Sequence, residues 1–228
     1  MSPETTPDPD SPKRRIFIVD DHPLVREWLA TLINQQSDLK VCGEAGSASE
    51  GIKLIPAVKP HVAVVDISME GGSGIELIKD LKALCPEVLV IVLSMHDEGL
   101  YRERALRAGA RGYVMKREAT KTVLQAIRCV LEGKLYLSDK LARKLAGELV
   151  EGKTAATASP VELLSDRELE VFQLLGRGLG TRQIAEEMHV SFRTVQTFSA
   201  RIKEKLNLTS ATELLRVAMR WNDSQALK

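Results

Sequence analysis

The chain lacks the features of several protein classes. Its three cysteines (Cys42, Cys85 and Cys129) are odd in number and widely spaced, which excludes a disulfide framework or a zinc site and predicts buried, reduced thiols. No apolar run approaches the roughly 18 residues of a membrane span, and the N-terminus lacks the basic and apolar regions of a signal peptide. The net charge of only +1 argues against a broadly basic nucleic-acid-binding surface but not against a local basic patch. These absences predict a cytoplasmic protein of bacterial type.

The 228 residues suffice for two modest domains. Residues 1–13 are rich in Pro, Asp, Ser and Thr and are expected to form a disordered tail. In residues 14–135, strand-like and helix-like runs alternate. Strands are expected near 15–20, 40–45, 61–66, 88–93 and 111–115. Helices are expected near 23–35, 48–57, 74–84, 98–108 and 119–132.

Such alternation predicts an α/β domain with a doubly wound, five-stranded parallel sheet. Residues 136–160 are expected to form a linker helix (138–151) and a hinge rich in Gly, Ala, Thr, Ser and Pro. Residues 161–228 have a purely helical pattern, which predicts a second, smaller all-α domain. Its helices are expected near 166–176, 181–188, 192–206 and 210–221.

Polar residues follow the apolar runs of four predicted strands. They are the Asp20-Asp21 pair, Asp66, Ser94 and Lys116. The carboxyl ends of parallel strands face one crevice, so we expect these groups to converge on one site. Each alone is a common turn or surface residue. Together they suit phosphoryl transfer: the carboxylates would hold Mg²⁺, and Asp66 would act as the nucleophile.

Residues 14–135 resemble the receiver domain of bacterial two-component response regulators, which has a flavodoxin-like fold. The motifs that carry the resemblance are Val19-Asp20-Asp21-His22-Pro23, Val65-Asp66-Ile67-Ser68-Met69, Gly72-Ser73-Gly74, Leu93-Ser94-Met95 and Ala108-Gly109-Ala110-Arg111-Gly112-Tyr113-Val114-Met115-Lys116. The resemblance implies that Asp66 accepts phosphate from a sensor histidine kinase.

The resemblance also implies roles for the neighbouring residues. Asp21 and Asp66 would bind Mg²⁺ directly, the Ser68 carbonyl would be a further ligand, and Asp20 would act mainly through water. Ser94 and Tyr113 would form a switch in which the hydroxyl moves toward the phosphate and the aromatic ring turns inward.

One residue departs from the receiver pattern. Glu70 stands where many such domains have proline four residues after the phosphoacceptor. A proline would stiffen the loop, whereas a carboxylate either points to solvent or leans toward the pocket and alters Mg²⁺ affinity or phosphate lifetime.

Residues 181–206 predict a helix-turn-helix unit, with Ser191 as the N-cap of the second helix. Helical spacing places Val195, Ile202 and Leu206 on one buried stripe. The opposite face carries Arg193, Gln196, Thr197, Ala200 and Arg201. Arg193, Arg201, Lys203 and Lys205 outnumber Glu204, which suits contacts with DNA phosphates. A helical bundle or a dimerisation module has the same pattern and stays an alternative.

Residues 161–221 resemble the LuxR-type (NarL/FixJ) helix-turn-helix. The resemblance is carried by Leu164-Ser165-Asp166-Arg167-Glu168-Leu169-Glu170-Val171, Gly178, Ile184-Ala185, Val190-Ser191, Thr194-Val195 and Lys205-Leu206. With the exposed face, it implies a set of DNA contacts: Arg193, Thr194, Gln196, Thr197, Ala200, Arg201 and Lys205. Gln196, Phe198 and Ala200 depart from the residues common in the family. Gln196 either makes a bidentate contact to adenine or touches the backbone.

The expected function is therefore that of a phosphorylation-controlled transcription factor that binds promoter DNA and forms a homodimer when phosphorylated. Leu214, Leu215, Val217 and Ala218 belong either to the dimer contact or to the domain core. Two alternatives remain. An aspartate-nucleophile phosphohydrolase would need an acid where Ser68 stands, and a phosphorylation-independent regulator or interaction module would keep the fold without the chemistry.

Overall fold

The computed structural model describes residues 12–69, 72–95, 100–137 and 160–226. The chain divides into two compact units, Met1–Ser138 and Asp139–Lys228. Glu70, the predicted linker helix at 138–151 and most of the predicted N-terminal tail lie outside the described residues.

The first unit contains a five-stranded parallel sheet with the order β2-β1-β3-β6-β7. The strands are β1 (Arg14–Val19), β2 (Leu39–Ala45), β3 (Val62–Asp66), β6 (Leu89–Ser94) and β7 (Gly112–Met115). The five predicted strands are confirmed, each to within about one residue at either end. Because β3 is the central strand, Asp66 at its carboxyl end has β1 on one side and β6 on the other.

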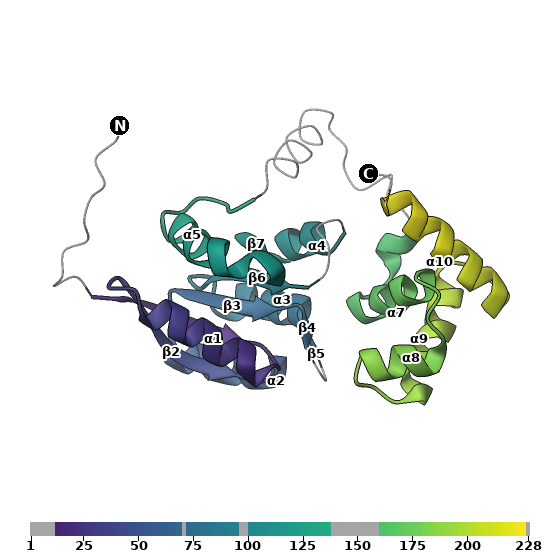
Figure 1. Ribbon diagram of the computed structural model, residues 1–228, viewed down its shortest axis with the longest axis horizontal. Coiled ribbons are helices and arrows are strands. Elements are labelled where there is room, and N and C mark those ends of the chain that lie inside the picture. Colours follow the sequence, from purple (N-terminus) through teal and green to yellow (C-terminus); the bar gives the residue numbers. More distant parts are fainter. Residues whose placement is uncertain (1–11, 70–71, 96–99, 138–159, 227–228) are drawn as a thin grey trace, which may run out of the picture. The chain divides into compact units, whose positions relative to one another are not determined.

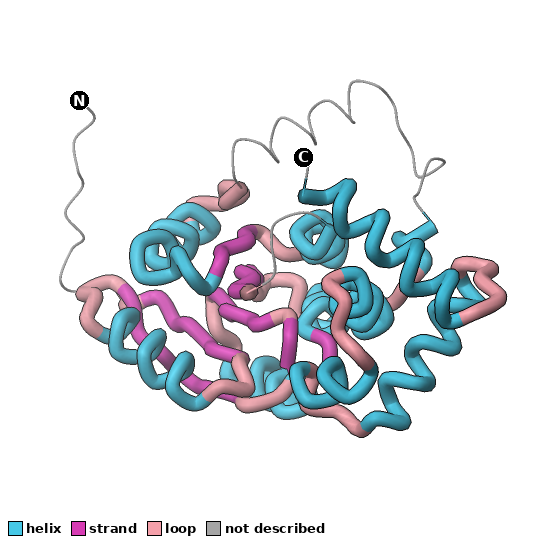
Figure 2. The backbone as a smooth tube through the Cα atoms, turned by 45° about the vertical axis from the view of Figure 1, so that its right-hand side comes forward, coloured by secondary structure: helices cyan, strands magenta, loops and turns pink. Residues whose placement is uncertain are grey.

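Helices cover both faces of this sheet (Figures 1 and 2). They are α1 (Pro23–Asn34), α2 (Ala48–Val58), α3 (Gly74–Leu84), α4 (Leu100–Ala108) and α5 (Ala119–Leu131). On one face, Leu29 of α1 and Ile127 of α5 pack in a cluster with Ile18. Val19, the next residue of β1, faces Gly51 of α2 on the other side. Successive side chains of β1 point to opposite faces of the sheet, so each face has its own core, as in a doubly wound fold.

A small antiparallel ladder follows the central strand and was not predicted. It joins β4 (Ser68–Met69) to β5 (Gly72–Ser73), with Ser68 opposite Ser73. Helix α3 begins directly after it, at Gly74. A Cβ atom at Gly74 would lie 2.0 Å from the carbonyl oxygen of Asp66, so only glycine lets the helix start against the backbone of that residue.

Short elements and Tyr136 complete the first unit. A 3-10 turn, η1 (Lys116–Glu118), follows β7. Tyr136 forms an isolated β-bridge with Gly112 of the edge strand β7. Its N–H donates to the Arg111 carbonyl at 2.9 Å. Cys42, Cys85 and Cys129 are all free, but only Cys85 is fully buried.

All the described secondary-structure elements of the second unit are helices. Its elements are η2 (Pro160–Leu163), α7 (Asp166–Gly176), α8 (Thr181–Glu187), α9 (Phe192–Lys205) and α10 (Ala211–Ala226). Phe172 of α7 meets Trp221 of α10 edge to face, with ring centroids 5.7 Å apart. The four predicted helices are confirmed, and the last one extends about five residues beyond its expected end.

The apolar residues of α10 divide between two environments. Leu214 and Ala218 are buried in the domain core, whereas Leu215 and the neighbouring Met219 are exposed. Within the described part of the chain, no helix combines the length and apolarity needed to cross a membrane.

A pH-sensitive contact lies at the amino-terminal end of the sheet. The Arg15 backbone N–H donates to Nδ1 of His61 at 3.0 Å, which requires that nitrogen to be unprotonated. Burial, together with the charges of Arg14 and Arg15, lowers the pKa of His61 below 6.5. The folded state therefore favours neutral His61, and the stability that this provides is present above pH 6.5 and lost as the pH falls through the lowered pKa.

We expect the wild-type protein to lose more unfolding free energy between pH 7.5 and pH 5.5 than His61→Asn, whose amide oxygen can still accept from Arg15. Urea unfolding at the two pH values measures this difference. His189→Asn, which changes an exposed histidine in the other unit, is the control. Equal pH dependence in wild type and His61→Asn would contradict the assignment.

Candidate functional site

Three of the predicted site residues meet at the carboxyl end of the sheet. Lys116 follows β7, and its Nζ lies 2.7 Å from Oδ2 of Asp20 and 2.7 Å from Oδ2 of Asp66. Asp20 and Asp66 are 1% and 3% exposed. The ammonium group therefore joins the ends of three strands through two buried carboxylates. We call Asp20, Asp21 and Asp66 the acidic pocket.

The electrostatics of the acidic pocket are only partly balanced. Burial raises the pKa of Asp66 to about 7; the Lys116 charge opposes this rise and the Asp20 charge adds to it. Burial alone would lower the pKa of Lys116, but Asp66 and Asp20 outweigh it and raise that pKa. One cation facing two buried carboxylates leaves an environment that favours further positive charge.

The donor set of the acidic pocket fits a hard divalent cation. Ligand atoms of Asp20, Asp21, His22 and Asp66 all lie within 4.8 Å of one another. Carboxylate oxygens are the ligands that Mg²⁺ prefers. The Ser68 backbone N–H donates to Oδ1 of Asp66 at 3.2 Å, which places this peptide at the edge of the pocket.

Two neighbours of the acidic pocket were missed by the sequence reasoning. The His22 N–H donates to Oδ1 of Asp20 at 2.9 Å, and His22 Nδ1 lies 2.7 Å from Oδ1 of Asp21. The Arg26 guanidinium donates to the backbone carbonyl of Asp20 at 2.6 Å. A single arginine in a helix is usually solvated, so nothing in the sequence distinguishes Arg26 from a surface residue.

The second unit presents a helix-turn-helix. Ser191 caps α9 as predicted, since its Oγ accepts the N–H of Thr194 at 3.1 Å. Val195 and Ile202 are fully buried, and Leu206 is half-buried. The opposite face of α9 is exposed, as the spacing predicted: Arg193, Gln196, Thr197, Ala200 and Arg201. Thr194 is half-buried at the start of the helix.

Comparison with known proteins covers both units. Residues 16–128 match the response regulator receiver domain, and residues 162–218 match the bacterial regulatory proteins of the luxR family. The oxygen regulatory protein NreC of Staphylococcus aureus is 36% identical over 210 residues, which cover 90% of this chain and 97% of NreC. The chain belongs to the two-component response regulators of the NarL/FixJ type. Because this family consists of transcriptional regulators, the phosphohydrolase alternative is excluded.

Solved structures of response regulators are also similar to this chain. The Salmonella typhimurium RcsB response regulator is 26% identical, with a TM-score of 0.60, and the match covers 91% of this chain and 98% of that one. A structure of two RcsB dimers bound to two parallel DNAs is 27% identical, with a TM-score of 0.55, covering 90% and 97%.

The predicted switch residues of this response regulator are both buried. Ser94 ends β6 and is 0% exposed, and Tyr113 in β7 is 4% exposed. The Arg102 guanidinium carbon of α4 lies 5.2 Å from the centroid of the Tyr113 ring, within the range of a cation–π interaction.

Lys205 makes an internal ion pair. Its Nζ donates to Oε2 of the buried Glu168 at 2.7 Å. The same oxygen accepts the N–H of Ser165 at 2.7 Å and completes the capping box of α7. Lys205 therefore anchors the end of α9 to the start of α7, and its predicted contact with DNA stays a prediction.

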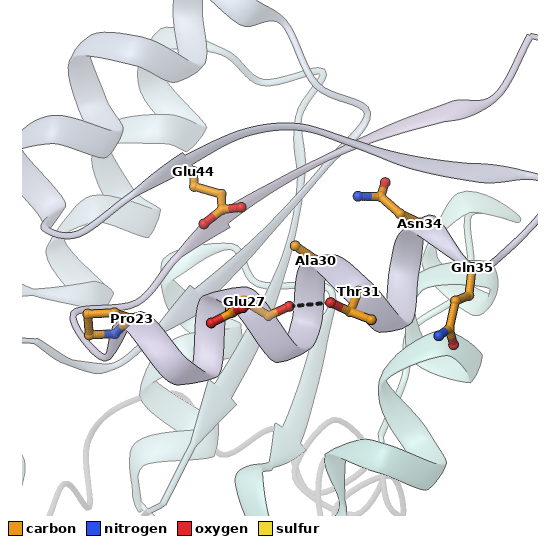
Figure 3. Close-up of a pocket in the computed structure, with 7 residues that line it drawn as sticks. All are labelled: Pro23, Glu27, Ala30, Thr31, Asn34, Gln35 and Glu44. Carbon is orange, nitrogen blue, oxygen red and sulfur yellow. Dashed lines mark hydrogen bonds between the residues drawn. The ribbon is translucent and has the colours of Figure 1, made fainter.

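An open groove of about 620 Å³ lies along α1. Figure 3 shows Glu44 of β2 facing the helix across this groove, with the Thr31 hydroxyl bonded to the Glu27 carbonyl at 2.9 Å. Its lining includes none of the residues of the acidic pocket, so the groove adds no group to the site.

Asp66→Asn should stabilise the response regulator in the absence of divalent cations. The pKa of Asp66 is raised from 3.8 to about 7 on folding, so stability that is present below pH 4 is lost as the pH rises to about 7. The asparagine variant has no such loss. We expect it to be more stable than wild type at pH 8 by roughly 2–4 kcal/mol, and the difference should shrink toward pH 4.

Chemical denaturation in EDTA measures this difference, and Asp80→Asn, at an exposed position of α3, is the control. Equal stability of wild type and Asp66→Asn at pH 8 would show that the buried carboxylate carries no such cost.

Lys205→Met and Arg201→Met should separate packing from DNA contact. Lys205→Met leaves the buried Glu168 carboxylate without its cation, so we expect the domain to lose about 1–2 kcal/mol of stability. Arg201→Met, on the exposed face, should leave stability unchanged. It should reduce the slope of log K for DNA binding against log salt concentration by about one, because one phosphate contact is lost. Denaturation and a salt titration on one selected duplex measure both. A reversed pattern would make Lys205 the phosphate contact.

Proposed function

We propose that Asp66 accepts a phosphoryl group from a histidine of a sensor kinase, and that this controls the binding of promoter DNA by α9. The observation that carries the proposal is the bridge from Lys116 to the buried carboxylates of Asp20 and Asp66. It sets a carboxylate nucleophile beside a fixed cation at the end of the central strand. The full chain, with residues 14–135 as receiver, 136–160 as linker and 161–228 as DNA-binding domain, takes part in this function.

In the proposed transfer, an oxygen of Asp66 forms a bond to phosphorus while the bond from phosphorus to the kinase histidine nitrogen breaks. The raised pKa of Asp66 indicates that added positive charge is needed to hold the anionic nucleophile at neutral pH. Asp20, Asp21 and Asp66, with the Ser68 carbonyl, would hold Mg²⁺, which neutralises charge on the phosphoryl oxygens.

The aspartyl phosphate would add negative charge at the buried Asp66. An aspartyl phosphate adds about two negative charges and strong acceptor oxygens. Lys116 is already within hydrogen-bond distance of Asp66 and would pair with these oxygens, while the Ser94 hydroxyl would donate to one of them. Tyr113 would respond as the inward-turning partner of Ser94. This rearrangement is the proposed signal.

The DNA side of the proposal rests on the exposed face of α9. Arg193 and Arg201 would contact phosphates, and Gln196, Thr197 and Ala200 would face base edges in the major groove. RcsB is described as dimers on DNA, and a dimer of this chain would read two half-sites about one helical turn apart. With DNA and a kinase as its partners, the protein would act in the cytoplasm.

Incubation with acetyl phosphate and Mg²⁺ tests the first step. We expect intact-protein mass spectrometry to show the gain of one phosphoryl group, lost in Asp66→Asn and retained in Asp80→Asn. Omitting Mg²⁺ or changing Asp21 to Asn should slow the gain strongly, since both remove charge neutralisation. No mass gain in wild type, or a gain that survives Asp66→Asn, would refute the proposal.

A further inference from the structure

The contact between Arg102 and Tyr113 links helix α4 to β7, the strand that Lys116 directly follows. Tyr113 and Lys116 are three residues apart at the end of β7. The Arg102 guanidinium lies over the face of the Tyr113 ring, 5.2 Å from its centroid. A cation over an aromatic face is attracted by the negative potential of that face, and the attraction grows as the pair is removed from water.

We propose that Arg102 is a positioning residue that holds the Tyr113 ring in its buried orientation. The proposal rests on the proposed function, in which the inward orientation of Tyr113 accompanies phosphorylation of Asp66. The structure has this ring buried, 4% exposed. Arg102 therefore biases the receiver toward the state that phosphorylation favours.

The geometry explains why Arg102 and not another charged residue of α4 has this role. The buried side of α4 carries Tyr101, Arg102, Glu103, Ala105 and Ala108, and Arg102 is the cation among them. Arg107, five residues further along, directs its guanidinium to Glu103 at 2.5 Å. A planar guanidinium stacks on a ring in a way that an ammonium does not, so Arg102→Lys should retain only part of the effect.

Linkage gives the bias a measurable consequence. A residue that favours the inward state must also strengthen binding of any ligand that requires this state. Beryllofluoride, a phosphoryl analogue that binds carboxylates together with Mg²⁺, is the probe. Removing the cation should shift the ring equilibrium roughly tenfold toward the outward state. The beryllofluoride Kd then rises by up to about tenfold, and by less the further the wild type already favours the inward state.

The test uses the full chain labelled with 3-fluorotyrosine, in which the resonance of Tyr113 is assigned by Tyr113→Phe. In Arg102→Met, which keeps an aliphatic side chain, we expect the Tyr113 resonance to become accessible to a soluble paramagnetic agent, and the beryllofluoride Kd to rise. Arg102→Lys should lie between wild type and Arg102→Met. Arg111→Met, which removes an exposed charge next to β7, should change neither readout.

A double-mutant cycle separates positioning from general destabilisation. In a Tyr113→Leu background the ring is absent, so Arg102→Met should no longer alter beryllofluoride binding. An unchanged Tyr113 resonance and Kd in Arg102→Met, or an equal effect of Arg102→Met in the Tyr113→Leu background, would overturn the inference. Failure of the wild type itself to bind beryllofluoride would instead refute Asp66 as the phosphoacceptor.

Discussion

The receiver unit depends on one ammonium group between two buried carboxylates. Lys116 joins Asp20 and Asp66 at 2.7 Å each, and so ties the ends of β1, β3 and β7 to one point. Two buried carboxylates without a cation would repel each other at a cost that a small domain cannot readily offset. With one cation they are tolerated but not fully satisfied, as the raised pKa of Asp66 shows. The remaining negative charge favours a divalent cation bound close by.

The second unit separates folding from recognition on one helix. Val195 and Ile202 fix α9 in the core, and the Lys205 to Glu168 ion pair fixes its end. The exposed residues between them, which include Gln196 and Ala200, do not contribute to the core of the domain. Under the proposed function, substitutions at these exposed positions would change which DNA sequence is bound without changing the fold.

Much of this organisation was predictable because it follows from periodicity. Apolar runs located the strands, and their polar end residues converged because parallel strands present their carboxyl ends together. Contacts that depend on side-chain direction were not predictable. Arg26 on the Asp20 carbonyl and Arg102 on Tyr113 look like solvated helix residues in the sequence. The ion pair of Lys205 with the buried Glu168 was likewise not predicted. The β4–β5 ladder is too short to show an alternating pattern.

The central claim is that a charge on Asp66 changes the affinity of α9 for DNA. The most direct measurement is the Kd of the full chain for one duplex, selected with the phosphorylated protein, before and after phosphorylation at fixed salt. The account predicts tighter binding after phosphorylation in wild type and no change on the same treatment in Asp66→Asn. Equal affinity of the phosphorylated and unphosphorylated wild-type protein for that duplex would contradict it.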